Sequence, residues 1–472
     1  MARSIGLKER SCCYVSHRFL PFEDETEELV SARYRAEKTV KQTAQRVFLE
    51  TLAAIQIPTA LARKLNREGS FVHAAGATID LREFREIVAI AFGKASFPMA
   101  EALREILAPE FQVDGILVGP ASPPVVLPGW KSFVGGHPIP SAESFAAGRA
   151  ILDRLGRCDE RTLIFFLISG GGSALVEQPL DRNVTLEDFQ KLHHALVTCG
   201  APIEEINVIR KHLSATKGGR MATAAPRSLK ITFAISDVPE GQESALASGP
   251  TLPDPTTSQD AERIARQYGL LAKLPASLHA SFERHALSET PKGDDPAFGR
   301  SHFELLLGTH DLTHACHHAC EAEGFVCLAD NSTDSWPLEK AANHLLAQLD
   351  ALKNDNPGRR VALLAGGEVS SPVTGEGMGG RNLAFVLACV PKIAGRKIVV
   401  LSAGTDGIDG NSPAAGAVAD GDTLQRAREA GIEPAEFLRR SDAYNFFKRL
   451  GDTIVTGPTG NNLRDLRILL AY

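Results

Sequence analysis

The segment 163–175, LIFFLISGGGSAL, constrains the fold more than any other part of this sequence. Six apolar residues run directly into a serine and three glycines. A short apolar run beside turn residues is typical of a strand buried on both faces, as in a parallel sheet. Glycines at the end of such a strand let backbone N–H groups converge on an anion. The alternative is a glycine-rich turn that holds no ligand. The predicted phosphate-binding residues are Ser169, Gly170, Gly171, Gly172 and Ser173.

The length and composition limit the class of protein. A chain of 472 residues exceeds what one hydrophobic core usually holds, so we expect two domains. The net charge of −6 leaves no basic surplus for binding nucleic acid, and no apolar run approaches the roughly 18–20 residues of a membrane span. The eight cysteines are scattered without a C-x-x-C pair, which is typical of reduced thiols. We therefore expect a cytoplasmic enzyme whose partners are neither nucleic acid nor membrane.

Apolar runs alternate with amphipathic stretches along the first half of the chain. The pattern predicts strands at 87–92, 163–168 and 231–235, and helices at 95–107, 141–155 and 204–224. Strands that alternate with helices of this length are typical of a three-layer α/β sandwich with a largely parallel sheet. The sequence therefore predicts an α/β fold.

The alternation resumes after a polar, proline- and glycine-rich segment at 287–301, which we interpret as a linker. Further strands are predicted at 303–307, 326–328, 361–364 and 398–401, and helices at 310–323, 336–352 and 382–389. A hairpin predicted at 368–374 would make the second sheet mixed. The expected organisation is an N-terminal extension (1–40), a first α/β domain (41–290) and a second α/β domain (303–472).

Cationic side chains follow two of the predicted elements. Lys94 lies at the start of a helix, where the helix dipole disfavours a cation, so we expect it to face an anion. Asn207, Arg210, Lys211 and Ser214 recur at helical spacing and form one polar stripe. We predict that Asn207 and Lys211 bind nucleotide phosphates. A solvent-exposed face is the alternative for both features.

Carboxylates lie at other predicted strand ends. Asp237 follows the strand 231–235, and Glu368, Asp406 and Asp409 lie in glycine-rich turns of the second half. Carboxylate oxygens at such positions are typical Mg²⁺ ligands, and turn capping is the alternative. We predict Asp237, Glu368 and Asp406 as metal ligands. Arg381 begins a helix behind two glycines, which suits a transferring phosphoryl group.

Several nucleotide motifs are absent or misplaced. The segment 375–380, GEGMGG, matches the dinucleotide fingerprint G-x-G-x-x-G, but the predicted strand ends about ten residues before it, which makes the match weak. No Walker A motif and no nucleophile elbow occurs in the sequence. A kinase with this sequence is therefore not of the P-loop kind.

Nine motifs occur in an order that resembles the glycerate 2-kinases with a MOFRL-type C-terminal domain. They are GKA (93–95), GHP (136–138), SGGGS (169–173), N-x-x-RKHLS (207–214), SDV (236–238), ASGPT (247–251), GGRN (379–382), GTDGID (404–409) and TGPTG (456–460). The resemblance extends from about residue 45 to the C-terminus. Two positions depart from the family pattern: Asn461 stands where a threonine is usual, and Gly308-Thr-His310 replaces a G-x-N turn.

This resemblance implies phosphorylation of D-glycerate on its 2-hydroxyl, with ATP and Mg²⁺, in a cleft between a Rossmann-like N-terminal domain and a smaller C-terminal domain. It also implies that Lys94 and Arg381 are catalytic. Because these residues lie in different predicted domains, we expect domain closure to assemble the site. Family members often carry the label hydroxypyruvate reductase, so an NAD(P)H-dependent reductase is the alternative. The sequence is compatible with a homodimer.

Overall fold

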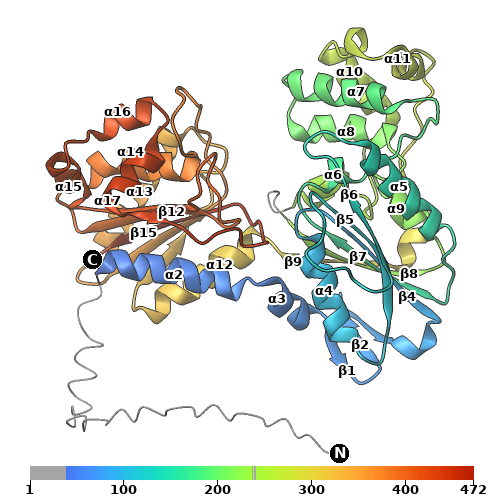
Figure 1. The fold of residues 1–472 in the computed structure, drawn as a ribbon, viewed down its shortest axis with the longest axis horizontal. Helices are drawn as coiled ribbons and strands as arrows, with labels where there is room; N and C mark the ends of the chain where they lie inside the picture. Colours follow the sequence, from blue (N-terminus) through green and yellow to red (C-terminus); the bar gives the residue numbers. More distant parts are fainter. Residues whose placement is uncertain (1–38, 237, 239–240) are drawn as a thin grey trace, which may run out of the picture. The chain divides into compact units, whose positions relative to one another are not determined.

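The computed structural model describes residues 39–236, 238 and 241–472, and its strands form three sheets. A small antiparallel sheet consists of β1 (Asn66–Glu68), β2 (Phe71–Ala74) and β3 (Ala77–Asp80). The other two sheets have six strands each, and Figure 1 shows helices against both of them. None of the helices in the described part of the chain combines the length and the apolar character needed to cross a membrane.

The first six-stranded sheet is entirely parallel, in the order β6-β5-β4-β7-β8-β9. Its strands are β4 (Glu86–Phe92), β5 (Val113–Gly119), β6 (Trp130–Val134), β7 (Thr162–Ile168), β8 (Leu229–Ile235) and β9 (Ser301–Leu307). Numbered along the chain within this sheet, the order is 3-2-1-4-5-6, which is the Rossmann order. The predicted Rossmann-like parallel sheet is therefore confirmed. Its topological switch point lies between β4 and β7, where such folds bind ligands.

Helices cover both faces of this sheet because its strands are apolar on both sides. On β4, Ile87, Ala89 and Ala91 share one core with α3 (Ile57–Lys64) and α4 (Ser96–Leu107). The alternate residues of β4 share another core with α5 (Ala142–Leu155), α6 (Gly172–Leu175) and Met221 of α9 (Arg220–Thr223). The continuous apolar runs thus produce the three layers that the sequence predicts.

A separate apolar cluster joins Phe145 of α5 to four helices that lie together in Figure 1. These are α7 (Leu186–Thr198), α8 (Ile203–Leu213), α10 (Ser258–Gln267) and α11 (Ala276–Glu283). The prediction of one helix over 204–224 is wrong. The chain leaves α8 after Leu213, where Ser214 is extended, and begins α9 at Arg220 after Gly218 (φ +55°) and Gly219 (φ +84°), which adopt the left-handed conformation.

The second six-stranded sheet is mixed, in the order β10-β11-β15-β12-β13-β14. Its strands are β10 (Val326–Ala329), β11 (Val361–Gly366), β12 (Ile398–Gly404), β13 (Gly416–Asp420), β14 (Thr453–Ile454) and β15 (Asp465–Ala471). Only β10 and β11 pair in parallel among these described strands. The mixed character is confirmed, but the predicted hairpin at 368–374 is wrong. Ser370 makes one isolated parallel bridge to Pro337, and the antiparallel neighbour of β11 is β15.

Two helical layers cover the second sheet. One face packs against α2 (Val40–Ala54) and α12 (Thr309–Ala322), which lie side by side in Figure 1. The other face packs against α13 (Leu338–Asp355), α14 (Arg381–Ile393), α16 (Pro434–Arg439) and α17 (Ala443–Leu450). The remaining elements are α15 (Thr423–Glu429), η1 (Leu81–Glu83), η2 (Glu243–Ser248), η3 (Leu271–Lys273) and η4 (Pro296–Arg300).

Two elements join a sheet other than the one expected from the sequence. A strand is present at the predicted position 303–307, but this strand, β9, pairs with β8 in the first sheet. Conversely, α2 precedes the first sheet in sequence, yet it contacts β12, β13 and β15 of the second. The predicted linker at 287–301 therefore does not separate the two sheets.

Candidate active site

Two of the predicted motifs meet at the switch point of the first sheet. Lys94 follows β4 and Ser169 follows β7, and the two strands are paired neighbours. The Lys94 N–H donates to the Gly170 carbonyl (2.9 Å), and Ser169 Oγ accepts from the Ala95 N–H (2.9 Å). Gly93 permits this contact because a Cβ atom there would lie only 2.2 Å from Ser169 Oγ. The Lys94 turn and the glycine-rich turn therefore form one unit.

The glycine-rich turn presents an open backbone. Gly171 is left-handed (φ +83°) and leads into the short helix α6. Within residues 39–236, 238 and 241–472, the N–H groups of Gly170 and Gly171 have no hydrogen-bond partner. A Cβ atom at Gly171 would lie 3.2 Å from His137 Cδ2 and 3.5 Å from Lys94 Cγ, so both side chains border the turn. This arrangement suits an anion.

Lys94 is exposed, and among the described residues its ammonium group has no ion pair. It borders a small pocket of about 100 Å³. The pocket draws residues from both halves of the sequence: Lys94, Ala95, Ser169, Gly170, Ile235, Asp406, Gly460, Asn461 and Asn462. The structure thus brings Lys94, part of the predicted phosphate turn and the predicted metal ligand Asp406 to one place.

Arg381 is held by two carboxylates. Its Nε and Nη2 atoms bond to Asp465 at 2.5 and 3.1 Å, and its Nη2 lies 2.9 Å from Glu368 Oε1. Burial lowers the pKa of Arg381, but the Asp465 hydrogen bond and the charges of Asp465 and Glu368 outweigh it, so the pKa is raised. Arg381 therefore keeps its charge at any working pH.

The partners of Arg381 belong to a wider ion network. Arg464 makes two bonds to Asp334 (2.7 and 2.6 Å), and its Nε lies 3.8 Å from Glu368 Oε1. Burial raises the pKa of Asp334, but Arg464 and the backbone of Glu368 outweigh it and the pKa is lowered. The predicted metal ligand Glu368 thus lies between two arginines, which compete for its carboxylate.

The other predicted metal ligands occupy different surroundings. Asp406 is half-buried, and its Oδ1 accepts from the Ile408 N–H (3.1 Å) as in a turn. A Cβ atom at Gly404 would lie 3.1 Å from Asp406 Oδ1 and 3.6 Å from Asp465 Oδ1, so Asp406 flanks the partner of Arg381. Asp237 lies outside the described residues. Within the described ranges, no three His, Cys, Asp or Glu side chains form a metal-binding group.

Asp409 has the capping role that the sequence left as the alternative. Its carboxylate accepts from the N–H groups of Asn382 (3.1 Å) and Leu383 (2.8 Å) at the start of α14. Burial is the main effect on its pKa, which is raised to about 6. Asp409 therefore fixes the helix end that carries Arg381.

The polar stripe of α8 is buried rather than exposed to solvent. Asn207 Oδ1 accepts from Ser248 Oγ (3.0 Å), which in turn contacts Ser173 Oγ (3.0 Å). Lys211 pairs with the buried carboxylate of Asp254 (3.2 Å). Asn207 is thus connected to the glycine-rich turn, whereas Lys211 already has a counterion.

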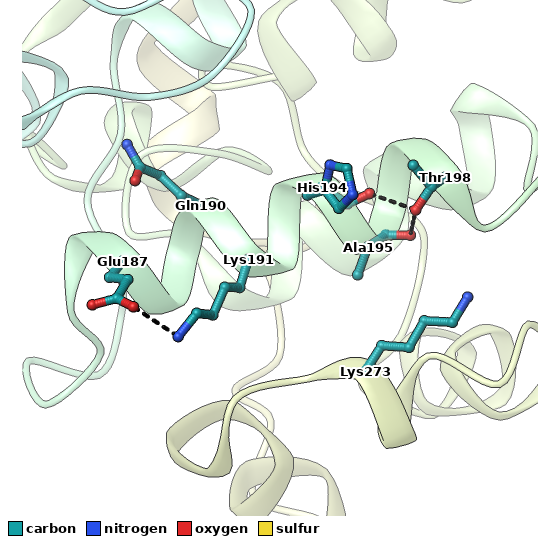
Figure 2. Close-up of a pocket in the computed structure, with 7 residues that line it drawn as sticks. All are labelled: Glu187, Gln190, Lys191, His194, Ala195, Thr198 and Lys273. Carbon is teal, nitrogen blue, oxygen red and sulfur yellow. Dashed lines mark hydrogen bonds and ion pairs between the residues drawn. The ribbon is translucent and has the colours of Figure 1, made fainter.

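A larger surface pocket, of about 570 Å³, lies along α7 and η3 (Figure 2). Figure 2 shows the Glu187–Lys191 ion pair (2.8 Å) and Lys273 at its border. None of the predicted site residues lines this pocket, so the smaller pocket at Lys94 is the candidate site. The segment 375–380 serves packing, since Cβ atoms at Gly375 and Gly377 would contact the Arg440 carbonyl at 2.5 and 2.6 Å.

Sequence reasoning missed Asp465, Asp334 and Arg464, although all three determine the charge around Arg381. Asp465 and Arg464 lie next to each other before a run of apolar residues, and this charged pair is the one signal available. Asp334 had no local signal, because its partner Arg464 lies 130 residues away.

Comparisons with known proteins extend over both sheets. Residues 43–283 match a domain of unknown function (DUF4147), and residues 361–465 match the MOFRL family. The chain is 33% identical to the D-glycerate 2-kinase of Thermotoga maritima over 84% of this chain and 93% of that one. It is 31% identical to the glycerate kinase of Rattus norvegicus over 93% and 95%.

Two further likenesses bear on fold and on reaction class. A crystal structure of glycerate kinase from Thermotoga maritima matches with a TM-score of 0.81 and 31% identity, over 92% of this chain and 99% of that chain. A putative hydroxypyruvate reductase of Agrobacterium vitis is 37% identical over 81% of this chain and 86% of that one. The fold is therefore shared with a solved kinase.

Proposed function

The chain belongs to the glycerate 2-kinase family, and from this premise we propose that it transfers the γ-phosphoryl group of ATP to the 2-hydroxyl of D-glycerate. The products are 2-phosphoglycerate and ADP. One observation carries the proposal. Among the described residues, the ammonium group of Lys94 has no ion pair, and it lies beside an open glycine-rich turn. A cation and free N–H groups at a switch point suit a nucleotide phosphate.

Phosphoryl transfer needs mainly positioning and charge neutralisation. The backbone of 169–173 would hold the phosphates, and Lys94 would neutralise the group that is transferred. The 2-hydroxyl oxygen attacks the γ-phosphorus, the bond to the bridging oxygen of ADP breaks, and the hydroxyl proton leaves to a base. Asp237 and Asp406 are the candidate bases. Arg381 would act from the second sheet, with its guanidinium oriented by Asp465.

The predicted Mg²⁺ site is part of the proposal. Asp406 fits a metal ligand because it is half-buried and lines the Lys94 pocket. Glu368 fits less well, since Arg381 and Arg464 share its carboxylate. A bound Mg²⁺ would offset phosphate charge, and we propose that one of Asp406 and Asp237 holds it while the other accepts the hydroxyl proton.

One pair of assays tests the reaction class. Incubation with D-glycerate, ATP and Mg²⁺ should release ADP, and enolase alone should then convert the product, because enolase acts on the 2-phosphate. Incubation with hydroxypyruvate and NADH should leave the NADH unchanged. NADH oxidation without ADP release would support the reductase instead. The segment 375–380 does not favour that alternative, because β11 ends at Gly366, well before it.

The Lys94→Ala variant tests the central residue. We expect turnover to fall by several powers of ten, because the transferring phosphoryl group loses its cation. Lys131→Ala, which removes an exposed lysine on β6, is the matched control and should keep normal turnover. Near-normal activity of Lys94→Ala would contradict the assigned role. A cytoplasmic location and a homodimer stay predictions from the sequence.

A further inference from the structure

The end of α8 and the turn after it contain three buried cations, and two of them have acidic partners. Lys211 pairs with Asp254 at 3.2 Å, and Lys217 pairs with Glu177 at 2.6 Å. The remaining cation is Arg210, which is only 9% exposed. Among the residues that the structure describes, no carboxylate lies within ion-pair distance of it. Among the described residues, this cluster therefore has three cations and two carboxylates, which leaves one positive charge without a paired carboxylate.

The guanidinium of Arg210 is held in a fixed direction. Its Nη2 lies 3.2 Å from His193 Nε2, and its Nε is buried without a partner. Because arginine can only donate, His193 Nε2 must accept, which requires a neutral ring. Burial lowers the pKa of His193 to about 3, helped by the charges of Arg210 and Lys217, so the ring stays neutral. The backbone of Pro138 provides a further hydrogen bond to that ring.

The cluster adjoins the proposed phosphate turn along two routes. His137, which precedes Pro138, would lie 3.2 Å from a Cβ atom at Gly171. Asn207 lies one helical turn before Arg210, and Ser248 connects it to Ser173. Arg210 is therefore connected to the glycine-rich turn through His193 on one side and through Asn207 and Ser248 on the other, and its buried guanidinium suits an anion.

We propose that Arg210 binds the carboxylate of the acceptor substrate, so that it determines specificity for an acid over a neutral polyol or amide. The inference rests on the proposed function. A single uncompensated charge matches a monoanionic carboxylate, and the guanidinium offers two parallel N–H groups to it. The polyphosphate has other partners in the glycine-rich turn and Lys94. Arg381 already faces two carboxylates and is less suited to a third.

Steady-state kinetics of Arg210→Met and Arg210→Lys test this assignment. We expect Arg210→Met to raise KM for D-glycerate roughly 10- to 100-fold, the range for a lost hydrogen bond to a charged group, with KM for ATP unchanged. Arg210→Lys should be intermediate, because it keeps the charge and loses the paired N–H groups. The matched control is Arg220→Met, which removes a partly buried arginine bonded to the carbonyls of Ser288 and Glu289 and should leave both KM values unchanged.

Calorimetric binding of D-glycerate and of its neutral amide gives a readout independent of turnover. Wild-type protein should prefer D-glycerate, and Arg210→Met should bind both with equal, weak affinity. An increased KM for ATP alone, an unchanged KM for both substrates, or a preserved preference for the acid would each overturn the inference. If thermal melts show that Arg210→Met does not fold, Arg210→Lys tests the inference by the same measurement, the affinity for D-glycerate relative to that for its amide. Absence of wild-type turnover would contradict the proposed function, while the binding comparison would still test Arg210.

Discussion

At the scale of single residues, the site depends on the close approach of Gly93 and Ser169. Gly93 has φ +121°, and a Cβ atom there would lie 2.5 Å from the Ser169 carbonyl oxygen and closer still to its hydroxyl. Backbone atoms cannot retreat from such a contact without moving a strand end. The position of Lys94 therefore depends on Gly93, the neighbouring residue that has no side chain.

We expect Gly93→Ala to lower the free energy of unfolding by about 2–4 kcal/mol and to abolish activity. The loss has two causes, the contact with Ser169 and the strain of a positive φ. The Gly200→Ala variant separates them, since Gly200 has φ +82° but no atom within 4 Å of its Cβ position. That control should lose only about 1–2 kcal/mol, from backbone strain alone. Urea denaturation measures both. Equal losses would show that the contact with Ser169 is unimportant.

His193 predicts a pH dependence of stability. Its pKa is lowered from 6.5 to about 3 in the folded chain, mainly by burial, so the unfolded chain binds a proton that the folded chain does not. The free energy of unfolding should therefore fall as the pH decreases from 6.5 towards 3, by up to about 1.4 kcal/mol per pH unit. His193→Gln should flatten the profile between pH 6.5 and 5. Parallel profiles of the variant and the wild type would contradict this.

At the scale of secondary structure, the helix that carries Arg381 is capped at its N-terminus by a residue from a distant loop. Asp409 lies between β12 and β13 and accepts the first N–H groups of α14. Asp409→Ala should cost about 2–4 kcal/mol of stability, because buried donors are left unpaired. Asp422→Ala is the matched control, since Asp422 precedes α15 without a side-chain cap. Chemical denaturation should show almost no loss for that variant, and a comparable loss in both would contradict the capping role.

The sequence predicted the elements whose signal is local. The strands β4, β7 and β8 contain mostly apolar runs, and Lys94 and the glycine-rich turn follow β4 and β7. By contrast, β15 contains Asp465 and the fully buried Arg467, whose Nη2 donates to the Gly366 and Gly367 carbonyls. These charges conceal a strand at the centre of its sheet. The partner of Arg381, Asp465, lies 84 residues away in sequence, so the local pattern around Arg381 gives no sign of it.

At the scale of the whole molecule, we propose a domain boundary near Gly308, after β9 rather than before it. The strand β9 pairs with β8 of the first sheet, and its Glu304 binds Lys64 of α3 (3.0 Å) and accepts from the Ala75 N–H beside β2 (2.7 Å). A fragment of residues 56–307 should unfold cooperatively, whereas a fragment of 56–300 should aggregate, because the edge of β8 is exposed. Circular dichroism melts and gel filtration distinguish them. Equal behaviour of the two fragments would place the domain boundary before β9.

The position of α2 has a consequence for biosynthesis. Its residues Ala44, Val47 and Phe48 are fully buried against a sheet whose strand β12 is encoded about 340 residues later, and whose strand β15 follows about 410 residues later. At about 5–20 residues per second, a ribosome needs roughly 20–70 s to make that stretch. Before α12 is made, about 255 residues after α2, the apolar side of the helix has no partner from this layer, and the sheet that it covers is completed later still. Nascent chains should therefore present α2 to chaperones, and codon choice across the middle of the gene would set how long they do so.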